Sequence, residues 1–187
     1  MSAGGNSDNI SLGAGRLWVA PIGTTEPTNA SSALDAAFRA IGYTEDGTTV
    51  TIELSNEEIE VAEEYDPVLY VMAKRKIMLK AQLAEATRRN LALTIGGLAN
   101  ANNDASSYTP PDPGDEVAFI VVWDSEETAL NNTANIRWLF HQCKSGGTIE
   151  TKRNKAPNKA LLPVELNVEK PAATPPFEVW PNASGQV

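Results

Sequence analysis

Residues 49–83 read TVTIELSNEEIEVAEEYDPVLYVMAKRKIMLKAQL, and this stretch decides the class of fold. At its start, Val50, Ile52 and Leu54 alternate with polar residues, so an extended chain has one apolar face and one polar face. The alternation returns at the end of the stretch, with apolar residues at positions 77, 79, 81 and 83. Two half-buried strands are therefore predicted, joined by a long loop at 55–75.

The loop at 55–75 is too long for an ordinary hairpin turn, so the sequence predicts a function for it. It lies in the most acidic part of the chain, which has no Lys or Arg from position 45 to 66. The acidic residues there number nine, as many as the formal net charge of −9. Two basic groups follow in the sequence: Lys74, Arg75, Lys76, Lys80, Arg88 and Arg89, and later Lys144, Lys152, Arg153, Lys155 and Lys159.

Three interpretations of this charge pattern stay open. The acidic segment forms a solvated face, or it binds calcium, although the Asp-rich loop with a central Gly that calcium sites use is missing. In the third interpretation the acidic segment of one copy pairs with a basic segment of the next. Such a head-to-tail contact produces rings or filaments.

Beyond this stretch, the apolar patterns predict further strands at 16–22, 117–123, 136–141 and 162–168, and a short polar strand at 148–152. One or two helical turns are predicted at 33–40. A short helix is predicted after position 85, with Thr87 as its N-cap and Gly96-Gly97 as its end. The tripeptide Glu45-Asp46-Gly47 predicts a turn.

Strands do not alternate with helices along the chain, so the predicted fold is mainly β. We expect an antiparallel β-sandwich or open barrel with one flanking α-helix. The predicted organisation is a flexible N-terminal arm at 1–14, a β domain at 15–170 and an extended Pro-rich C-terminal tail at 171–187.

The sequence offers little for catalysis or for a cofactor. His141 and Cys143 are the only residues of their kinds, so a closed zinc site cannot be built within one chain. At i, i+2 on one strand they share a face and could be neighbours, but no nucleophile, phosphate-binding or dinucleotide-binding motif is present. No enzyme activity, cofactor or metal is therefore expected.

The composition also limits the possible partners and location. The sequence pI of about 4.6 argues against a general nucleic-acid binder. A single cysteine suits a reducing cytoplasm. No apolar run approaches the ~20 residues of a spanning helix, so no membrane anchor is expected.

Three blocks of sequence, in order, resemble the major tail tube proteins of long-tailed, siphovirus-type bacteriophages, particularly those of actinobacterial phages. In LGAGRLWVAPIGTTEPT (12–28), a strand ending in aromatic-Val-Ala-Pro leads to Gly-Thr and Pro. In AIGYTEDGTTVTIE (40–53), a Gly-aromatic pair precedes a Thr-Glu-Asp-Gly turn. In KIMLKAQLAEATRRNLALTIGG (76–97), the family pattern Glu-x-Thr-x-x-Asn-Leu is matched by Glu85, Thr87, Asn90 and Leu91.

The resemblance implies a structural virion protein of the phage tail, assembled in the host bacterial cytoplasm. Hexameric rings would join strands of each copy into an inner barrel and stack around a tape-measure protein that DNA later replaces. The tube would also meet tail tip and tail terminator proteins, and DNA would pass without specific binding. The loop at 55–75 would reach a neighbouring subunit or ring, while the two termini order on assembly.

Two sets of site residues follow from this resemblance and the charge pattern. The subunit and ring interface is predicted to contain Glu57, Glu58, Glu60, Glu63, Glu64, Tyr65, Lys74, Arg75 and Arg153. The lumen is predicted to be an acidic wall that includes Thr49, Thr51, Glu53, Lys80 and Gln82. Lys80 requires an acidic partner there, because an exposed lysine would bind phosphate.

Other functions stay open at this point: a head decoration protein, a tail terminator, a contractile-tail inner tube or a carbohydrate-binding sandwich domain. The last would expose aromatic residues on one surface. The four tryptophans lie mostly within apolar strand patterns, which predicts core or interface positions for Trp18, Trp123, Trp138 and Trp180.

Overall fold

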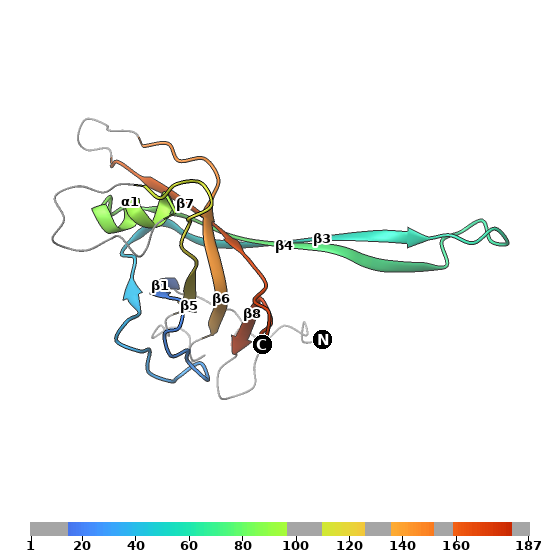
Figure 1. Ribbon diagram of the computed structural model, residues 1–187, viewed down its shortest axis with the longest axis horizontal. Coiled ribbons are helices and arrows are strands. Elements are labelled where there is room, and N and C mark those ends of the chain that lie inside the picture. Colours follow the sequence, from blue (N-terminus) through green and yellow to red (C-terminus); the bar gives the residue numbers. More distant parts are fainter. Residues whose placement is uncertain (1–14, 97–109, 126–135, 152–158, 181–187) are drawn as a thin grey trace, which may run out of the picture.

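The computed structural model describes residues 15–96, 110–125, 136–151 and 159–180. It confirms a mainly β fold, an eight-stranded antiparallel sheet that does not close into a barrel (Figure 1). The path through the sheet is β2-β1-β5-β6-β7-β4-β3, with β8 paired to β6. The strands are β1 (Gly15–Pro21), β2 (Arg39–Ala40), β3 (Thr44–Ile59), β4 (Leu69–Leu83), β5 (Phe119–Ser125), β6 (Arg137–Gly146), β7 (Leu162–Val168) and β8 (Phe177–Trp180).

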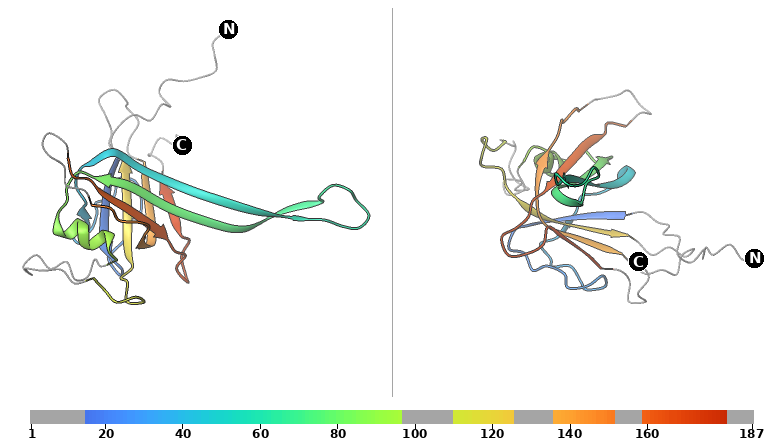
Figure 2. Two further views of the ribbon diagram at one scale, coloured as in Figure 1. Left: turned by 90° about the horizontal axis from the view of Figure 1, so that it is seen from above. Right: turned by 90° about the vertical axis from the view of Figure 1, so that its right-hand side faces the viewer.

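The sheet folds over on itself along β6. Residues 137–143 of β6 pair with β5, whereas residues 143–146 pair with β7. Figure 2 shows the resulting two layers, with β1, β5 and β6 in one and β7, β4 and β3 in the other. The main core lies between the layers and contains Phe119, Phe140, Leu79, Leu162 and Leu166, each exposed by 1% or less.

Helix α1 (Arg88–Thr94) packs at one side of this core and confirms the predicted helix. The hydroxyl of Thr87 accepts a hydrogen bond from the backbone N–H of Asn90 (3.2 Å), as an N-cap does. Gly96 follows the helix with φ +97°, a conformation that ends helices and favours glycine. Asn90 is buried, and its side-chain amide donates to the carbonyl of Ile41 (2.8 Å), which ties the helix to the chain after β2.

A second, smaller core covers the outer face of β1, β5 and β6. It contains Phe38, Ile120, Val122 and Leu139 and is closed by the segment at 22–38. The four tryptophans pack against the two cores, Trp123 and Trp138 on the main core and Trp18 and Trp180 on the second, as predicted.

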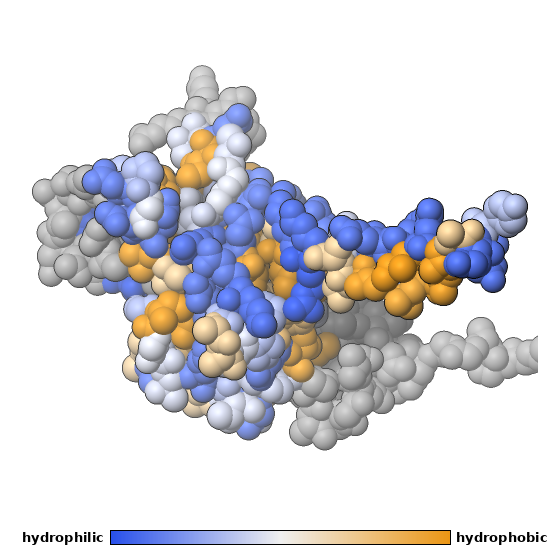
Figure 3. Space-filling model, turned by 45° about the vertical axis from the view of Figure 1, so that its right-hand side comes forward, coloured by the Kyte–Doolittle hydropathy of each residue, from blue (hydrophilic) through white to orange (hydrophobic). Residues whose placement is uncertain are grey.

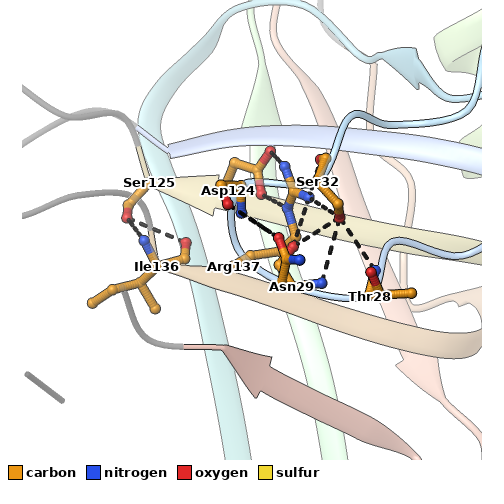
Figure 4. Close-up of polar contacts among 8 residues, drawn as sticks. Thr28, Asn29, Ser32, Asp124, Ser125, Ile136 and Arg137 are labelled. Atoms are coloured by element: carbon orange, nitrogen blue, oxygen red, sulfur yellow. Dashed lines mark hydrogen bonds and ion pairs between the residues drawn. The ribbon is translucent and has the colours of Figure 1, made fainter. Parts of the chain in front are cut away.

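Arg137 fastens the segment at 22–38 to the sheet (Figure 4). Its guanidinium is 7% exposed and forms a two-point ion pair with Asp124, at 2.6 and 3.0 Å. The same group donates to the carbonyls of Asn29 (3.0 Å) and Ser32 (2.7 Å). A buried charge of this kind is stable only when it is fully paired, so the segment cannot leave without a large penalty.

Several local predictions were wrong. Residues 33–40 form no helical turns, because the side chain of Asp35 accepts from the N–H of Ala37 (2.9 Å) and closes a turn instead. The tripeptide at 45–47 is a bulge within β3, with Gly47 at φ +78°. Residues 148–151 form no strand, and Ile149 packs against the main core.

His141 and Cys143 do not share a face. Phe140 pairs with Val121 of β5, and Cys143 pairs with Phe119. Between these two pairs β6 has one residue more than β5, which is a bulge. Phe140 and Cys143 therefore both enter the main core. His141 lies on the opposite side, where its Nδ1 is 2.9 Å from a carboxylate oxygen of Glu26.

The largest difference concerns the segment predicted as a loop at 55–75. Most of it is strand, because β3 and β4 continue as one long hairpin and only residues 60–68 connect them. One extra residue, Ala73, sits in β4 between the pairs Ser55–Lys74 and Asn56–Met72. Within the predicted C-terminal tail, β8 pairs with β6 of its own chain. The predicted N-terminal arm at 1–14 lies outside the described residues.

Candidate assembly interface

The distal part of the β3–β4 hairpin, residues 52–76, projects from the body of the molecule (Figure 1). We call this segment the arm and the remainder of the described chain the body. Every arm residue is exposed except Pro67, which is half-buried. No other described part of the chain forms a covering layer on the arm, so its side chains are exposed to solvent in the described structure.

The arm is a two-stranded ribbon with two open edges. Strand β3 is the last strand of the sheet, so one edge is open along its length. Strand β4 pairs with β7 only from Met78 to Leu83, which leaves the part of β4 in the arm open on its other side. An isolated two-stranded hairpin is only marginally stable in water.

Large hydrophobic side chains are concentrated on the arm. Of the twelve that are exposed in the described residues, ten lie between Ile52 and Met72. In the view of Figure 3, hydrophobic residues gather along one edge of the arm and hydrophilic residues along the other. A patch of this extent on a soluble protein usually marks an interaction surface. Its members are Ile52, Leu54, Ile59, Val61, Tyr65, Val68, Leu69, Tyr70, Val71 and Met72.

The predicted interface residues fall mainly on this arm. Its acidic side chains form no ion pair within the described residues. Lys74 and Arg75 lie at its base, opposite Ser55 and Leu54, and the guanidinium of Arg75 is 5.8 Å from the ring centre of Phe177 in β8. Arg153 lies outside the described residues. The acidic and aromatic residues that the structure brings together on the arm are Glu57, Glu58, Glu60, Glu63, Glu64 and Tyr65.

The residues predicted to face a lumen also share one surface. Pairing places Thr49 opposite Lys80 and Glu53 opposite Lys76, and alternation puts Thr51 and Gln82 on the same face of the sheet, away from the main core. The acidic partner required for Lys80 is Glu165 of β7, whose carboxylate lies 3.1 Å from the lysine Nζ.

The acidic character expected of this face is absent from β3 and β4. Alternation along β4 adds Lys74 and Lys76 to the face that carries Lys80, so three lysines accompany Glu53 and Glu165. Lys74 and Lys76 were not among the residues predicted for this face, although the same period-two pattern places them there. These five groups give the face one net positive charge, and the concentrated negative charge belongs to the arm.

No constellation in the described residues indicates catalysis. No group of three or more His, Cys, Asp or Glu side chains there is placed to hold a metal ion. Cys143 is fully buried, and this burial, with Glu169 nearby, raises the pKa of its thiol far above the usual range, so it is not a nucleophile. In the described part of the chain no helix is long and apolar enough to cross a membrane.

The fold and the arm define a class of protein: an antiparallel β domain that exposes a long hairpin. The sequence matches the model of the family described as "Phage tail tube protein" over residues 3–182. The chain belongs to this family, and it is a structural protein of a phage tail.

The chain is similar to a chain in "Cryo-EM structure of the anti-feeding prophage (AFP) baseplate, 6-fold symmetrised", with a TM-score of 0.49 and 12% identity, covering 97% of this chain and 98% of that one. No curated protein sequence matches the chain.

Proposed function

We propose that this protein forms stacked hexameric rings that make the tail tube of a long-tailed bacteriophage and conduct DNA from the capsid to the host. The observation that carries the proposal is the arm, a ribbon with two open edges and ten exposed large hydrophobic side chains that no other described part of the chain covers. In a closed ring, edge strands of adjacent copies pair and no edge is left open.

The polar face of β3 and β4 lines the lumen in this proposal. A DNA conduit must not bind phosphate, and unpaired lysines on its wall would do so. The ion pair of Lys80 with Glu165 (3.1 Å) and the position of Glu53 opposite Lys76 offset two of the three lysine charges on this face. A near-neutral polar wall lets DNA slide, which replaces the acidic wall expected from the sequence.

The arm connects one subunit to a neighbour in the same or the adjacent ring. From Ile52 to Ile59 it extends about 23 Å, at ~3.3 Å per residue. This reach is sufficient to cross a subunit boundary. In the assembled virion tail the tube encloses a tape-measure protein and ends at tail tip and terminator proteins, and the subunits are made in the host bacterial cytoplasm.

Electron microscopy of the concentrated, purified protein tests the proposal. The expected product is a hollow rod built of stacked rings. The matched control deletes residues 54–75 of the arm. An Asn-Gly turn then joins Glu53 to Lys76, its cross-strand partner. This control should remain a folded monomer with the circular dichroism spectrum of a β protein.

Two outcomes contradict the proposal. Solid aggregates or closed shells from the full-length chain would point to another virion role, and hollow rods from the armless control would show that the arm does not carry assembly.

A further inference from the structure

At the end of the body opposite the arm, α1, β2 and β1 surround two adjoining hollows of about 270 and 400 Å³ that share Ala40 and Gly42. Figure 1 shows α1 at this end of the molecule, far from the tip of the arm. The arm of a chain therefore cannot fill the hollows of that same chain.

The smaller hollow combines an apolar floor with a basic rim. The floor contains Val19, Ile41 and Leu93, each at least 96% buried, and the rim contains Arg39 and Arg89. Glu85 is the one carboxylate among the residues that line it, and this carboxylate accepts a hydrogen bond from the backbone N–H of Tyr43 (3.2 Å). Two guanidinium groups against one engaged carboxylate leave the rim with excess positive charge.

The tip of the arm has the complementary chemistry. Tyr65 is fully exposed, and it is flanked by Glu63, Glu64 and Asp66. An aromatic ring surrounded by carboxylates matches an apolar floor surrounded by guanidinium groups. Tyrosine and arginine are also the residues that most often dominate the binding energy of protein interfaces.

We infer that the arm tip of one copy binds the hollow between α1 and β2 of the next copy. Tyr65 enters the hollow above Val19, Ile41 and Leu93, while the flanking carboxylates pair with the arginines of the rim. The donor and acceptor surfaces lie at opposite ends of one chain, so the contact is heterologous and repeats from copy to copy. The inference rests on the proposed assembly and names the surface that receives the arm.

A charge exchange tests this acceptor surface in the full-length chain. Glu63→Lys with Glu64→Lys reverses the tip, and Arg39→Glu with Arg89→Glu reverses the rim. Each reversed protein should lose association about a hundredfold, measured by sedimentation, because like charges then face each other. An equimolar mixture of the two, or one chain with all four changes, should recover association, whereas Lys170→Glu should leave it unchanged.

Folding of the reversed proteins is checked separately. The neutral pair Arg39→Gln with Arg89→Gln should weaken association less than the reversed pair and melt at the wild-type temperature. Tyr65→Ala should weaken association about thirtyfold, as expected for a central aromatic anchor.

Disulfide trapping gives an independent readout. A chain with Tyr65→Cys and Ala40→Cys should form a ladder of covalent oligomers on mild oxidation, because the tip of each copy meets the shared wall of the next hollow. A chain with Tyr65→Cys and Lys170→Cys should form no ladder.

Two results together would contradict the proposed acceptor surface. The rim-reversed protein would assemble like wild type while the tip-reversed protein does not, and the chain with Tyr65→Cys and Ala40→Cys would form no ladder. That result leaves the tube proposal intact, since the arm would then act at another surface. If the ladder forms but no hollow rods are seen, the contact between arm tip and hollow exists and the proposed tube function is wrong.

Discussion

Strand β4 runs through both the body and the arm, and its two halves differ in almost every physical respect. From Met78 to Leu83 it has neighbouring strands on both sides and contributes Leu79 and Leu83 to the main core. From Leu69 to Lys76 it has one neighbouring strand, and every residue is exposed. The body is stabilised by a core of its own residues, whereas no other described residues form a layer over the arm.

Thiol accessibility gives the largest expected difference between these regions. A cysteine introduced at Val61 of the arm should react with a thiol reagent at once. Cys143 should react only through unfolding of the body, because burial raises the pKa of its thiol and excludes the reagent. Stopped-flow labelling should therefore show a rate ratio of at least about 10⁴. Equal rates in concentrated guanidinium are the control, and fast native labelling of Cys143 would contradict the prediction.

Truncation of the main core should cause the next largest change. Phe119 is fully buried, so Phe119→Ala should lower the free energy of unfolding by about 4 kcal/mol, measured by urea denaturation. Phe119→Leu keeps most of the volume and should cost about 1 kcal/mol. If Phe119→Ala and Phe119→Leu lowered the free energy of unfolding equally, the core around Phe119 would not be tightly packed.

Removal of the buried guanidinium of Arg137 should cost about 3 kcal/mol, because the half-buried Asp124 then loses its partner. The double change Arg137→Met with Asp124→Leu should recover part of this loss. Limited proteolysis of the Arg137→Ala protein should cut first within 22–38, the segment that Arg137 fastens. Unchanged proteolysis there would contradict the fastening role.

A change on the arm should have the smallest effect on folding. Tyr70 is exposed, so Tyr70→Ser should alter the free energy of unfolding of the monomer by less than about 0.5 kcal/mol. The same change should weaken self-association in a sedimentation experiment. If Tyr70→Ser lowered the free energy of unfolding as much as Phe119→Ala does, the arm would contribute to folding like the body, and the distinction between the two regions would fail.

The body was more predictable from the sequence than the arm because a core selects one face of each strand. The alternation at 162–168 predicted β7, and Thr87 with Gly96 predicted both ends of α1. In 55–75 no core makes such a selection. Hydrophobic residues therefore occur on both faces of the ribbon, and the strand period disappears from the sequence.

Other features depend on contacts that sequence spacing does not reveal. The segment held by Arg137 is more than 100 positions away in the chain, at 29–32. The bulge after Phe140 places His141 and Cys143 on opposite faces of the sheet, and no residue type in β6 indicates that bulge. For the candidate interface, the residue types of the acidic tip were evident, but the basic hollow is assembled from three separate segments around Val19, Ile41 and Leu93.

The extra residue at Ala73 has a consequence for the geometry of the whole particle. A bulge bends its strand and increases the local twist, and this one lies where the arm leaves the body. Deleting Ala73 would keep the pair Asn56–Met72 and straighten the ribbon. In the proposed tube this deletion should change the rotation between successive subunits while every residue of the tip is kept, because the bulge sets the direction in which the arm leaves the body.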